Sequence, residues 1–205
     1  MALLLSMFIG FGVAVDNVRL AYVTSLTNMR ASFIQPRYVQ LGDSITAGGG
    51  VWGWRLGLDP FSAVTLARGG STTRQINALA APLSALKPCT IYILAGSNDV
   101  GDPRQTRANF LIDYEQLLGT AAHSGATIVA TLIPPVTDPA QSARAATFNS
   151  SLRALLASRK IRTIDLWPML AENGVMKPEY TTDGVHFSEA AYAIWTAEMR
   201  KAAAC

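Results

Sequence analysis

From residue 37 onward, short apolar runs alternate with longer stretches in which apolar and polar residues are mixed. This alternation is typical of strands and helices that follow one another in a parallel sheet covered by helices. It predicts five strands, at residues 38–41, 62–66, 90–94, 127–133 and 163–166. The expected fold class is therefore α/β, with a five-stranded parallel sheet.

Capping residues and helix breakers place four helices between and after these strands. The start signals stand at residues 71–73, 102–103, 138–139 and 188–189, and apolar residues at helical spacing follow each of them. We expect the first helix to continue toward Leu86 and stop before Pro88, and the second to end near Gly125. The apolar stripes of these helices are interpreted as core.

The length of 205 residues suits one α/β domain with a sizeable core and is too short for two. A single domain is expected over residues 37–205. Half of the residues are apolar and 15% are charged, which excludes a disordered chain. The densest basic group, Arg159-Lys160 with Arg162, is interpreted as a solvated helix end, so no nucleic-acid partner is expected.

The amino-terminal segment, residues 1–36, is interpreted as an apolar stretch followed by a connector. Residues 1–15 carry no charge and resemble the apolar region of a signal peptide, but no Lys or Arg precedes them. A membrane-spanning helix needs about 20 apolar residues, so residues 1–15 are a short stretch for one. Three interpretations stay open: an export signal or membrane anchor, a helix packed on its own domain, and a dimer contact. An export signal would place the protein in the periplasm, in the cell envelope or outside the cell; otherwise it would be cytoplasmic.

Two cysteines, Cys89 and Cys205, are too few for a disulfide framework. We expect Cys89 to be a small buried residue and Cys205, the last residue, to be mobile. No spacing of His and Cys is typical of a metal site, so the expectation is catalysis without metal or cofactor.

The first predicted strand ends in Gly42-Asp43-Ser44, so a strand leads into a tight turn that carries a hydroxyl. Ligands bind outside the carboxyl ends of parallel strands, which makes Ser44 a candidate nucleophile. Asp43 is expected to brace the turn by accepting hydrogen bonds from backbone N–H groups.

A serine needs a neighbouring base to become a nucleophile. His186 follows Asp183 by three residues, so the carboxylate can reach back and fix the tautomer and direction of the imidazole. The other histidine, His123, stands at the expected end of a helix and is given a surface or capping role. Asp165, at the end of the fifth predicted strand, is the rival candidate for the acid.

The oxyanion of an acyl-transfer reaction needs hydrogen-bond donors. Two stretches that follow strand-like runs offer them, at Gly69-Gly70 and at Gly96-Ser97-Asn98. We expect the N–H groups of Ser44 and Gly70 and the side-chain amide of Asn98 to converge on one point.

Four apolar residues near these loops are candidates for a substrate pocket. Trp52 and Trp54 lie just after three glycines that follow Ser44, and they either wall the pocket or pack against the sheet. Pro135 and Val136 follow the fourth strand at the same edge, where they either shape an apolar pocket or simply end the strand.

The residues singled out above stand in four blocks: Gly42-Asp43-Ser44, Gly70, Gly96-Ser97-Asn98-Asp99 and Asp183-Gly184-Val185-His186. Their order is that of the sequence blocks of SGNH (GDSL) hydrolases, and the chain resembles this family of serine esterases and lipases. The resemblance implies a three-layer α/β/α sandwich of flavodoxin-like type. It also implies Ser44 as nucleophile, Asp183 and His186 as the rest of the triad, and Ser44, Gly70 and Asn98 as oxyanion donors. The chain departs from the family before Gly70, where Leu66-Ala67-Arg68-Gly69 stands in a stretch that often holds asparagine.

The expected function is hydrolysis of small-molecule carboxylic esters, with short to medium acyl chains, through an acyl-enzyme on Ser44. Four alternatives use the same site: thioester hydrolysis, lysophospholipid hydrolysis, O-deacetylation of carbohydrates, and acyl transfer to an alcohol. An ordinary α/β-hydrolase is disfavoured because Thr46 stands where its G-x-S-x-G elbow ends in glycine. The alternative from another class is a non-catalytic carbohydrate- or lipid-binding module, which would not need nucleophile, base, acid and oxyanion donors together.

Overall fold

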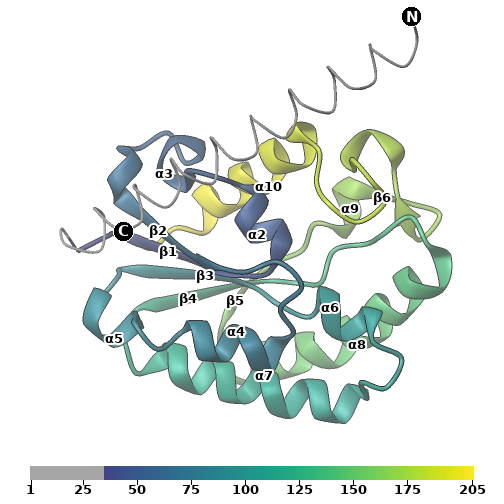
Figure 1. Ribbon diagram of the computed structural model, residues 1–205, viewed down its shortest axis with the longest axis horizontal. Coiled ribbons are helices and arrows are strands. Elements are labelled where there is room, and N and C mark those ends of the chain that lie inside the picture. The colour runs from purple at the N-terminus through teal and green to yellow at the C-terminus, as the bar shows by residue number, and fades with distance from the viewer. Residues whose placement is uncertain (1–34) are drawn as a thin grey trace, which may run out of the picture.

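The computed structural model describes residues 35–205 (Figure 1), so the expectations for residues 1–34 lie outside the described part. Its centre is a parallel sheet with the strand order β2-β1-β3-β4-β5. The strands are β1 (Tyr38–Gly42), β2 (Ala63–Ala67), β3 (Thr90–Leu94), β4 (Thr127–Thr131) and β5 (Arg162–Ile164). This confirms the predicted five-stranded parallel sheet, although β4 and β5 each end two residues earlier than expected.

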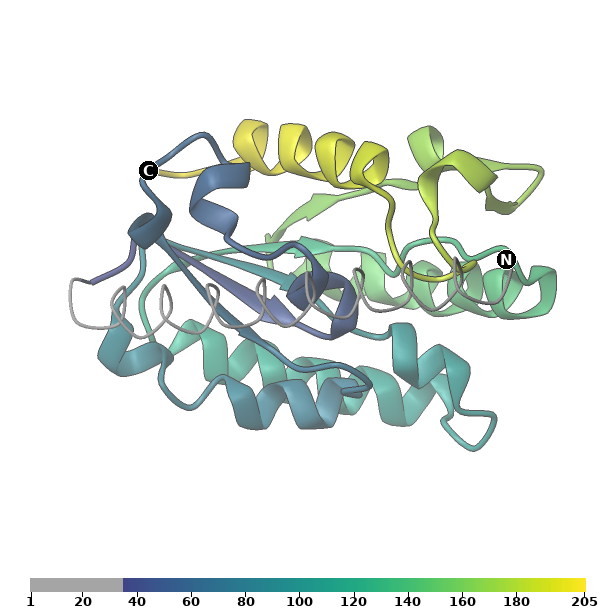
Figure 2. The same cartoon turned by 45° about the horizontal axis from the view of Figure 1, so that its top comes forward.

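Helices cover both faces of the sheet and make a three-layer α/β/α arrangement (Figures 1 and 2). One layer holds α4 (Thr73–Leu79), α5 (Leu83–Leu86), α6 (Ser97–Gly101), α7 (Arg107–Ala122) and α8 (Pro139–Ser158). The other holds α2 (Ser44–Gly48), α3 (Trp52–Arg55), α9 (Trp167–Leu170) and α10 (Glu189–Ala202). The connections contain a short hairpin, β6 (Ala171–Glu172) with β7 (Val175–Met176), and the 3-10 turns η1 (Pro60–Ser62) and η2 (Pro178–Tyr180). Within residues 35–205, no helix combines the length and apolarity that crossing a bilayer requires.

Two apolar cores lie between the layers, one on each face of the sheet. Strand β3 shows how the sequence supplies both, because successive side chains of a strand point to opposite faces. Ile91 and Ile93 belong to the core under α7 and α8, whereas Tyr92 and Leu94 belong to the core under α10. A strand buried on both faces is apolar over most of its length, and β3 is apolar from Ile91 to Leu94.

Two helices begin where their capping residues predict. Asp138 accepts a hydrogen bond from the Gln141 N–H (2.7 Å) at the start of α8. Ser188 accepts one from the Ala191 N–H (3.4 Å) at the start of α10. The side-chain oxygens thus satisfy backbone donors that have no partner inside the helix.

The other two predicted helices differ from the expectation in their boundaries. The first is broken in two, since Pro82 lies between α4 and α5 and has no N–H to continue a helix. The second, α7, begins at Arg107 instead of near Asp102. Thr106 caps it by accepting from the Asn109 N–H (3.1 Å), while the Asp102 side chain pairs with Arg104 in the preceding turn.

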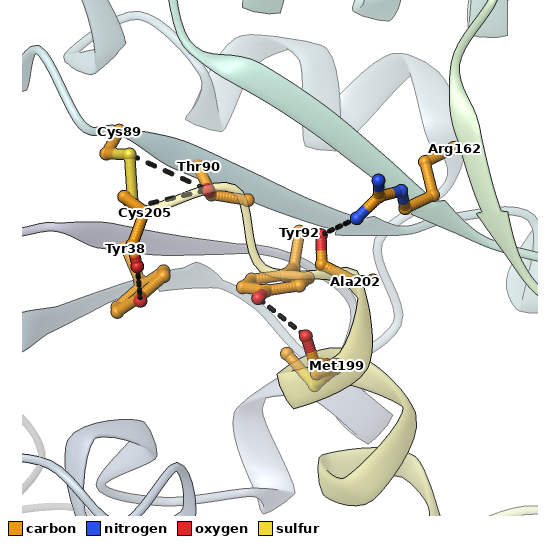
Figure 3. The surroundings of a disulfide bond; sticks show 8 residues. All are labelled: Tyr38, Cys89, Thr90, Tyr92, Arg162, Met199, Ala202 and Cys205. Carbon is orange, nitrogen blue, oxygen red and sulfur yellow. Dashed lines mark hydrogen bonds between the residues drawn. A yellow bond between two sulfur atoms is a disulfide. The ribbon is translucent and has the colours of Figure 1, made fainter.

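Cys89 and Cys205 form a disulfide bond, which corrects the expectation of a buried thiol and a mobile last residue (Figure 3). Their Cα atoms are 6.2 Å apart although 116 positions separate them in the sequence. Helix α10 returns the chain to the amino ends of the strands, where Cys89 precedes β3. There the Tyr38 hydroxyl donates to the Cys205 carbonyl (3.3 Å), and Arg162 donates to the Ala202 carbonyl (2.8 Å). The carboxyl terminus is therefore fastened to the sheet.

Replacing Cys205 by serine is expected to lower the free energy of unfolding by about 2–4 kcal/mol, because the disulfide restricts the unfolded chain. Urea unfolding of the oxidised proteins, followed by circular dichroism, measures the difference. A thiol reductant should shift the wild type toward the variant and leave the variant unchanged. Equal unfolding midpoints for both oxidised proteins would contradict a stabilising disulfide.

Candidate active site

Ser44 is the first residue of α2, immediately after β1. Asp43 caps this short helix by accepting a hydrogen bond from the Ile45 N–H (3.0 Å). Gly42 must be a glycine here, since a Cβ would lie 2.7 Å from the Leu94 carbonyl oxygen and still closer to the Thr46 side chain. The sequence Gly-Asp-Ser therefore fits a turn that is packed tightly against β3 and presents Ser44 at the carboxyl edge of the sheet.

The structure brings His186 to Ser44 from 142 residues further along the chain. The His186 Nε2 atom lies 2.9 Å from Ser44 Oγ, and the His186 Nδ1 atom lies 2.6 Å from Asp183 Oδ2. With the ring proton on Nδ1, the imidazole donates to the carboxylate and accepts from the serine hydroxyl. Both distances are within the range in which protons are transferred between side chains.

The loop that carries Asp183 and His186 is held by its own backbone. Asp183 Oδ1 accepts from the N–H groups of Val185 (3.0 Å) and His186 (2.8 Å). Bonds from the His186 backbone and side chain lower the pKa of Asp183 to about 2, so this carboxylate is ionised at neutral pH. Gly184 has a φ of +95° and its carbonyl accepts from the Thr137 N–H (2.9 Å), which joins the loop to the segment after β4.

The two rival residues have other partners. Asp165 accepts from the Trp167 N–H (3.1 Å) and pairs with Arg153 (2.7 Å) at the end of β5. His123 lies at the exposed end of α7, where its Nδ1 atom is 2.6 Å from the Gly119 carbonyl oxygen, in keeping with the predicted capping role.

The residues predicted as oxyanion donors, Gly70, Ser44 and Asn98, lie just after three adjacent strands, β2, β1 and β3. Asn98 is the second residue of α6, and one N–H of its side-chain amide donates to the Ser71 carbonyl (2.9 Å). An amide has two N–H groups, so one remains for another acceptor. Gly70 has a φ of +72°, and no atom lies within 4 Å of the place of a Cβ there. A Cβ on its neighbour Gly69 would be 3.8 Å from Ser44 Cβ, which shows how close the β2 loop comes to the serine.

A sequence model of the GDSL-like lipase/acylhydrolase family matches residues 41–194, about three quarters of the chain. The chain belongs to this family. Solved structures agree with the fold, among them a GDSL-like lipase from Bacteroides thetaiotaomicron with 21% identity and a TM-score of 0.72, where 82% of this chain covers 87% of that one.

Two further similar structures are an acetyl xylan esterase and an aryl esterase from M. smegmatis. The first has 17% identity and a TM-score of 0.68, with 80% of this chain covering 98% of that one. The second has 17% identity and a TM-score of 0.64, and the match covers 82% of this chain and 99% of that one. A comparison with curated protein sequences found no significant match.

Asp43 is fully buried beside Ser44. Burial raises its pKa to about 6, against the effect of the Ile45 N–H that the carboxylate accepts. The hydrogen bond from the Ile45 N–H to the Asp43 carboxylate braces the turn, as expected for this residue.

In this GDSL-family chain Trp52 packs in the core, which is one of the two roles considered for it. Its side chain is 1% exposed, packs edge-on against Trp195 with ring centres 5.0 Å apart, and donates to the Thr46 carbonyl (2.9 Å). The Trp52 side chain therefore supports α2 from the side of the core. Trp54 is 60% exposed, because the turn of α3 points it away from the core.

Pro135 and Val136 also lie in the interior. The Val136 carbonyl accepts from the Met176 N–H (3.0 Å), and Thr137 binds the loop of Asp183 as described above. The segment after β4 therefore holds the loop that carries Asp183 and His186.

Sequence reasoning also missed Tyr192, which supports the turn that carries Ser44. The Tyr192 hydroxyl, on α10, donates to the Ile45 carbonyl (2.7 Å) directly after Ser44. Tyr192 stands on the apolar stripe of its helix, and that signal indicates only a core position. Within the described residues, no group of His, Cys, Asp and Glu is arranged to hold a metal ion.

Proposed function

We propose that this GDSL-family hydrolase cleaves carboxylic esters with short to medium acyl chains through an acyl-enzyme on Ser44. The observation that carries the proposal is the pair of contacts that joins three side chains, at 2.6 Å from Asp183 to His186 and at 2.9 Å from His186 to Ser44. A nucleophile, a base and a group that orients the base are the parts that covalent acyl transfer needs.

In the proposed reaction, Ser44 Oγ attacks the ester carbonyl while His186 Nε2 takes the serine proton. The carboxylate of Asp183 stabilises the imidazolium that forms, and its low pKa keeps it charged. Collapse of the tetrahedral intermediate releases the alcohol, which receives the proton from His186. A water molecule then repeats the cycle on the acyl-enzyme and releases the acid.

The negative oxygen of the intermediate is proposed to bind the N–H groups of Ser44 and Gly70 and the amide of Asn98. Support comes from the N–H of Asn98 that is not needed for Ser71, and from the open space above Gly70. These donors act most strongly when they are fixed before the charge develops.

Replacing Asn98 by alanine is expected to lower kcat about 10²- to 10³-fold, as the loss of one oxyanion donor usually does. Steady-state hydrolysis of p-nitrophenyl acetate measures the effect, and thermal melting shows whether the fold survives. Asn109→Ala, an exposed change on α7, is the matched control and should leave kcat unchanged. If kcat stayed near normal in Asn98→Ala, the residue would have no part in the site.

The substrate class is proposed as esters because the family is one of acylhydrolases and two similar proteins are named as esterases, one of them for acetyl xylan. A series of p-nitrophenyl esters from acetate to palmitate tests the acyl length, with Ser44→Ala as the background. The highest kcat/KM is expected between acetate and hexanoate. A maximum at palmitate would overturn the proposed chain length, and no hydrolysis above the background would overturn the function itself.

A further inference from the structure

We propose that Arg68 binds an anionic group of the substrate, a carboxylate or a phosphate, and so makes anionic esters the preferred substrates of this site. The inference rests on the proposed ester hydrolysis and adds a specificity-determining residue to it. It starts from the loop after β2, where Arg68 and Gly69 precede Gly70.

The backbone of Arg68 is fixed beside the nucleophile. Its N–H donates to the Gly42 carbonyl (3.3 Å), two residues before Ser44. The next residue, Gly69, is the one whose Cβ would lie 3.8 Å from Ser44 Cβ. Arg68 therefore lies at the edge of the site, on the β2 loop that also carries Gly70.

The side chain of Arg68 is directed by the same residue that holds the Asn98 amide. The Arg68 Nε–H donates to Ser71 Oγ (3.2 Å), and the Ser71 carbonyl accepts from Asn98 Nδ2 (2.9 Å). Ser71 is 1% exposed, so it is a rigid anchor for both groups. One guanidinium and one amide are thus held by a single buried serine.

The positive charge of Arg68 is not neutralised within the part of the chain that the structure describes. Five other arginines of that part pair with a carboxylate: Arg55, Arg74, Arg104, Arg153 and Arg159. Arg68 is exposed and has no such ion pair among residues 35–205.

The acidic residues of the neighbouring loops are engaged elsewhere. Asp43 is buried and accepts from the Ile45 N–H. Asp99 accepts from the N–H and the hydroxyl of Thr73 (2.8 and 2.9 Å) and from the Gln105 amide (3.0 Å). Among residues 35–205 the guanidinium donates only from Nε, to Ser71 Oγ, so the N–H groups of its two Nη atoms remain for a ligand.

The chemistry of this ligand follows from the guanidinium, whose planar pair of donors matches the two oxygens of a carboxylate or phosphate. Such a group can be carried by the acyl part or by the alcohol part of an ester. Two pairs of substrates distinguish an anionic group on the acyl part from one on the alcohol part. The pair of mono-p-nitrophenyl glutarate and p-nitrophenyl pentanoate places the charge on the acyl side. The pair of 3-acetoxybenzoate and its methyl ester places it on the alcohol side.

The quantity to measure is the ratio of kcat/KM for the anionic member of each pair to that for the neutral member. Arg68→Gln is expected to lower this ratio about three- to tenfold for at least one pair, mostly through KM, since the side chain is exposed. Arg68→Lys should keep part of the preference. In the wild type, added salt should lower the same ratio because it screens the interaction.

The matched control is Arg107→Gln, which removes an exposed positive charge from the start of α7 and should leave both ratios unchanged. Unchanged ratios in Arg68→Gln, or an equal loss in Arg107→Gln, would overturn the role of Arg68. An equal loss of kcat/KM for the neutral and the anionic esters would also overturn that role, because it would show that Arg68 acts only on the structure. Failure of the proposed function would look different, as absence of Ser44-dependent hydrolysis of the neutral esters.

Discussion

Replacing Ser44 by alanine is expected to lower kcat for p-nitrophenyl acetate by about 10⁴-fold or more. In the proposed mechanism the change removes the atom that forms the acyl-enzyme, Oγ at 2.9 Å from His186 Nε2. The remaining groups can still bind the ester and stabilise an oxyanion, which leaves a small rate above that of water. Initial rates at saturating substrate, corrected for spontaneous hydrolysis, give the number.

The control for this variant is Ser150→Ala, an exposed serine of α8, which should have normal kcat. The melting temperature of Ser44→Ala should stay close to that of the wild type, since the Ser44 side chain contributes one hydrogen bond that is partly open to solvent. Activity within about tenfold of the wild type would mean that the measured hydrolysis does not proceed through Ser44.

The second large effect is expected for His186→Ala, whose kcat should fall by about the same factor as that of Ser44→Ala. The double variant should be no slower than either single one, because a serine without its base and a base without its serine are equally ineffective. Free energies of activation calculated from the three rates show this non-additivity directly.

The chain supplies a control for this substitution, since His123 is the other histidine. His123→Ala removes an exposed imidazole from the end of α7 and should leave kcat unchanged. Independent, multiplying losses in the double variant would show that Ser44 and His186 do not act as one unit.

The features predicted from sequence are those that depend on neighbours in the chain. Strand β3 was predicted with its correct bounds because both faces are buried and five apolar or β-branched residues follow one another. The starts of α8 and α10 were predicted because Asp138 and Ser188 bind N–H groups only three residues away. Helix α7 started later than expected because Thr106, a weaker signal than Asp102-Pro103, is the residue that caps it.

Features that depend on distant contacts were missed. The Cys89–Cys205 disulfide requires that α10 return to the amino ends of the strands, and no spacing in the sequence reports this. Trp52 and Tyr192 were also not recognised as supports of α2, because the carbonyls of Thr46 and Ile45 that they bind are visible only in the folded chain.

For the site, the sequence indicated the kinds of groups, and the fold determined their distances. Asp183 and His186 are three residues apart, so their contact could be expected from one loop. The contact of His186 with Ser44 spans 142 residues and depends on the packing of α10 against α2 through Tyr192. The role of Arg68 follows from Ser71, which is a partner that only the structure identifies.

Covalent trapping of the serine tests the central claim most directly. The protein is treated with a fluorophosphonate, and intact mass with peptide mapping then locates the adduct. The account predicts one phosphonyl group on Ser44 in the wild type, none in Ser44→Ala, and much slower labelling in His186→Ala. An adduct on another residue of the folded wild type, or labelling of His186→Ala at the wild-type rate, would contradict it.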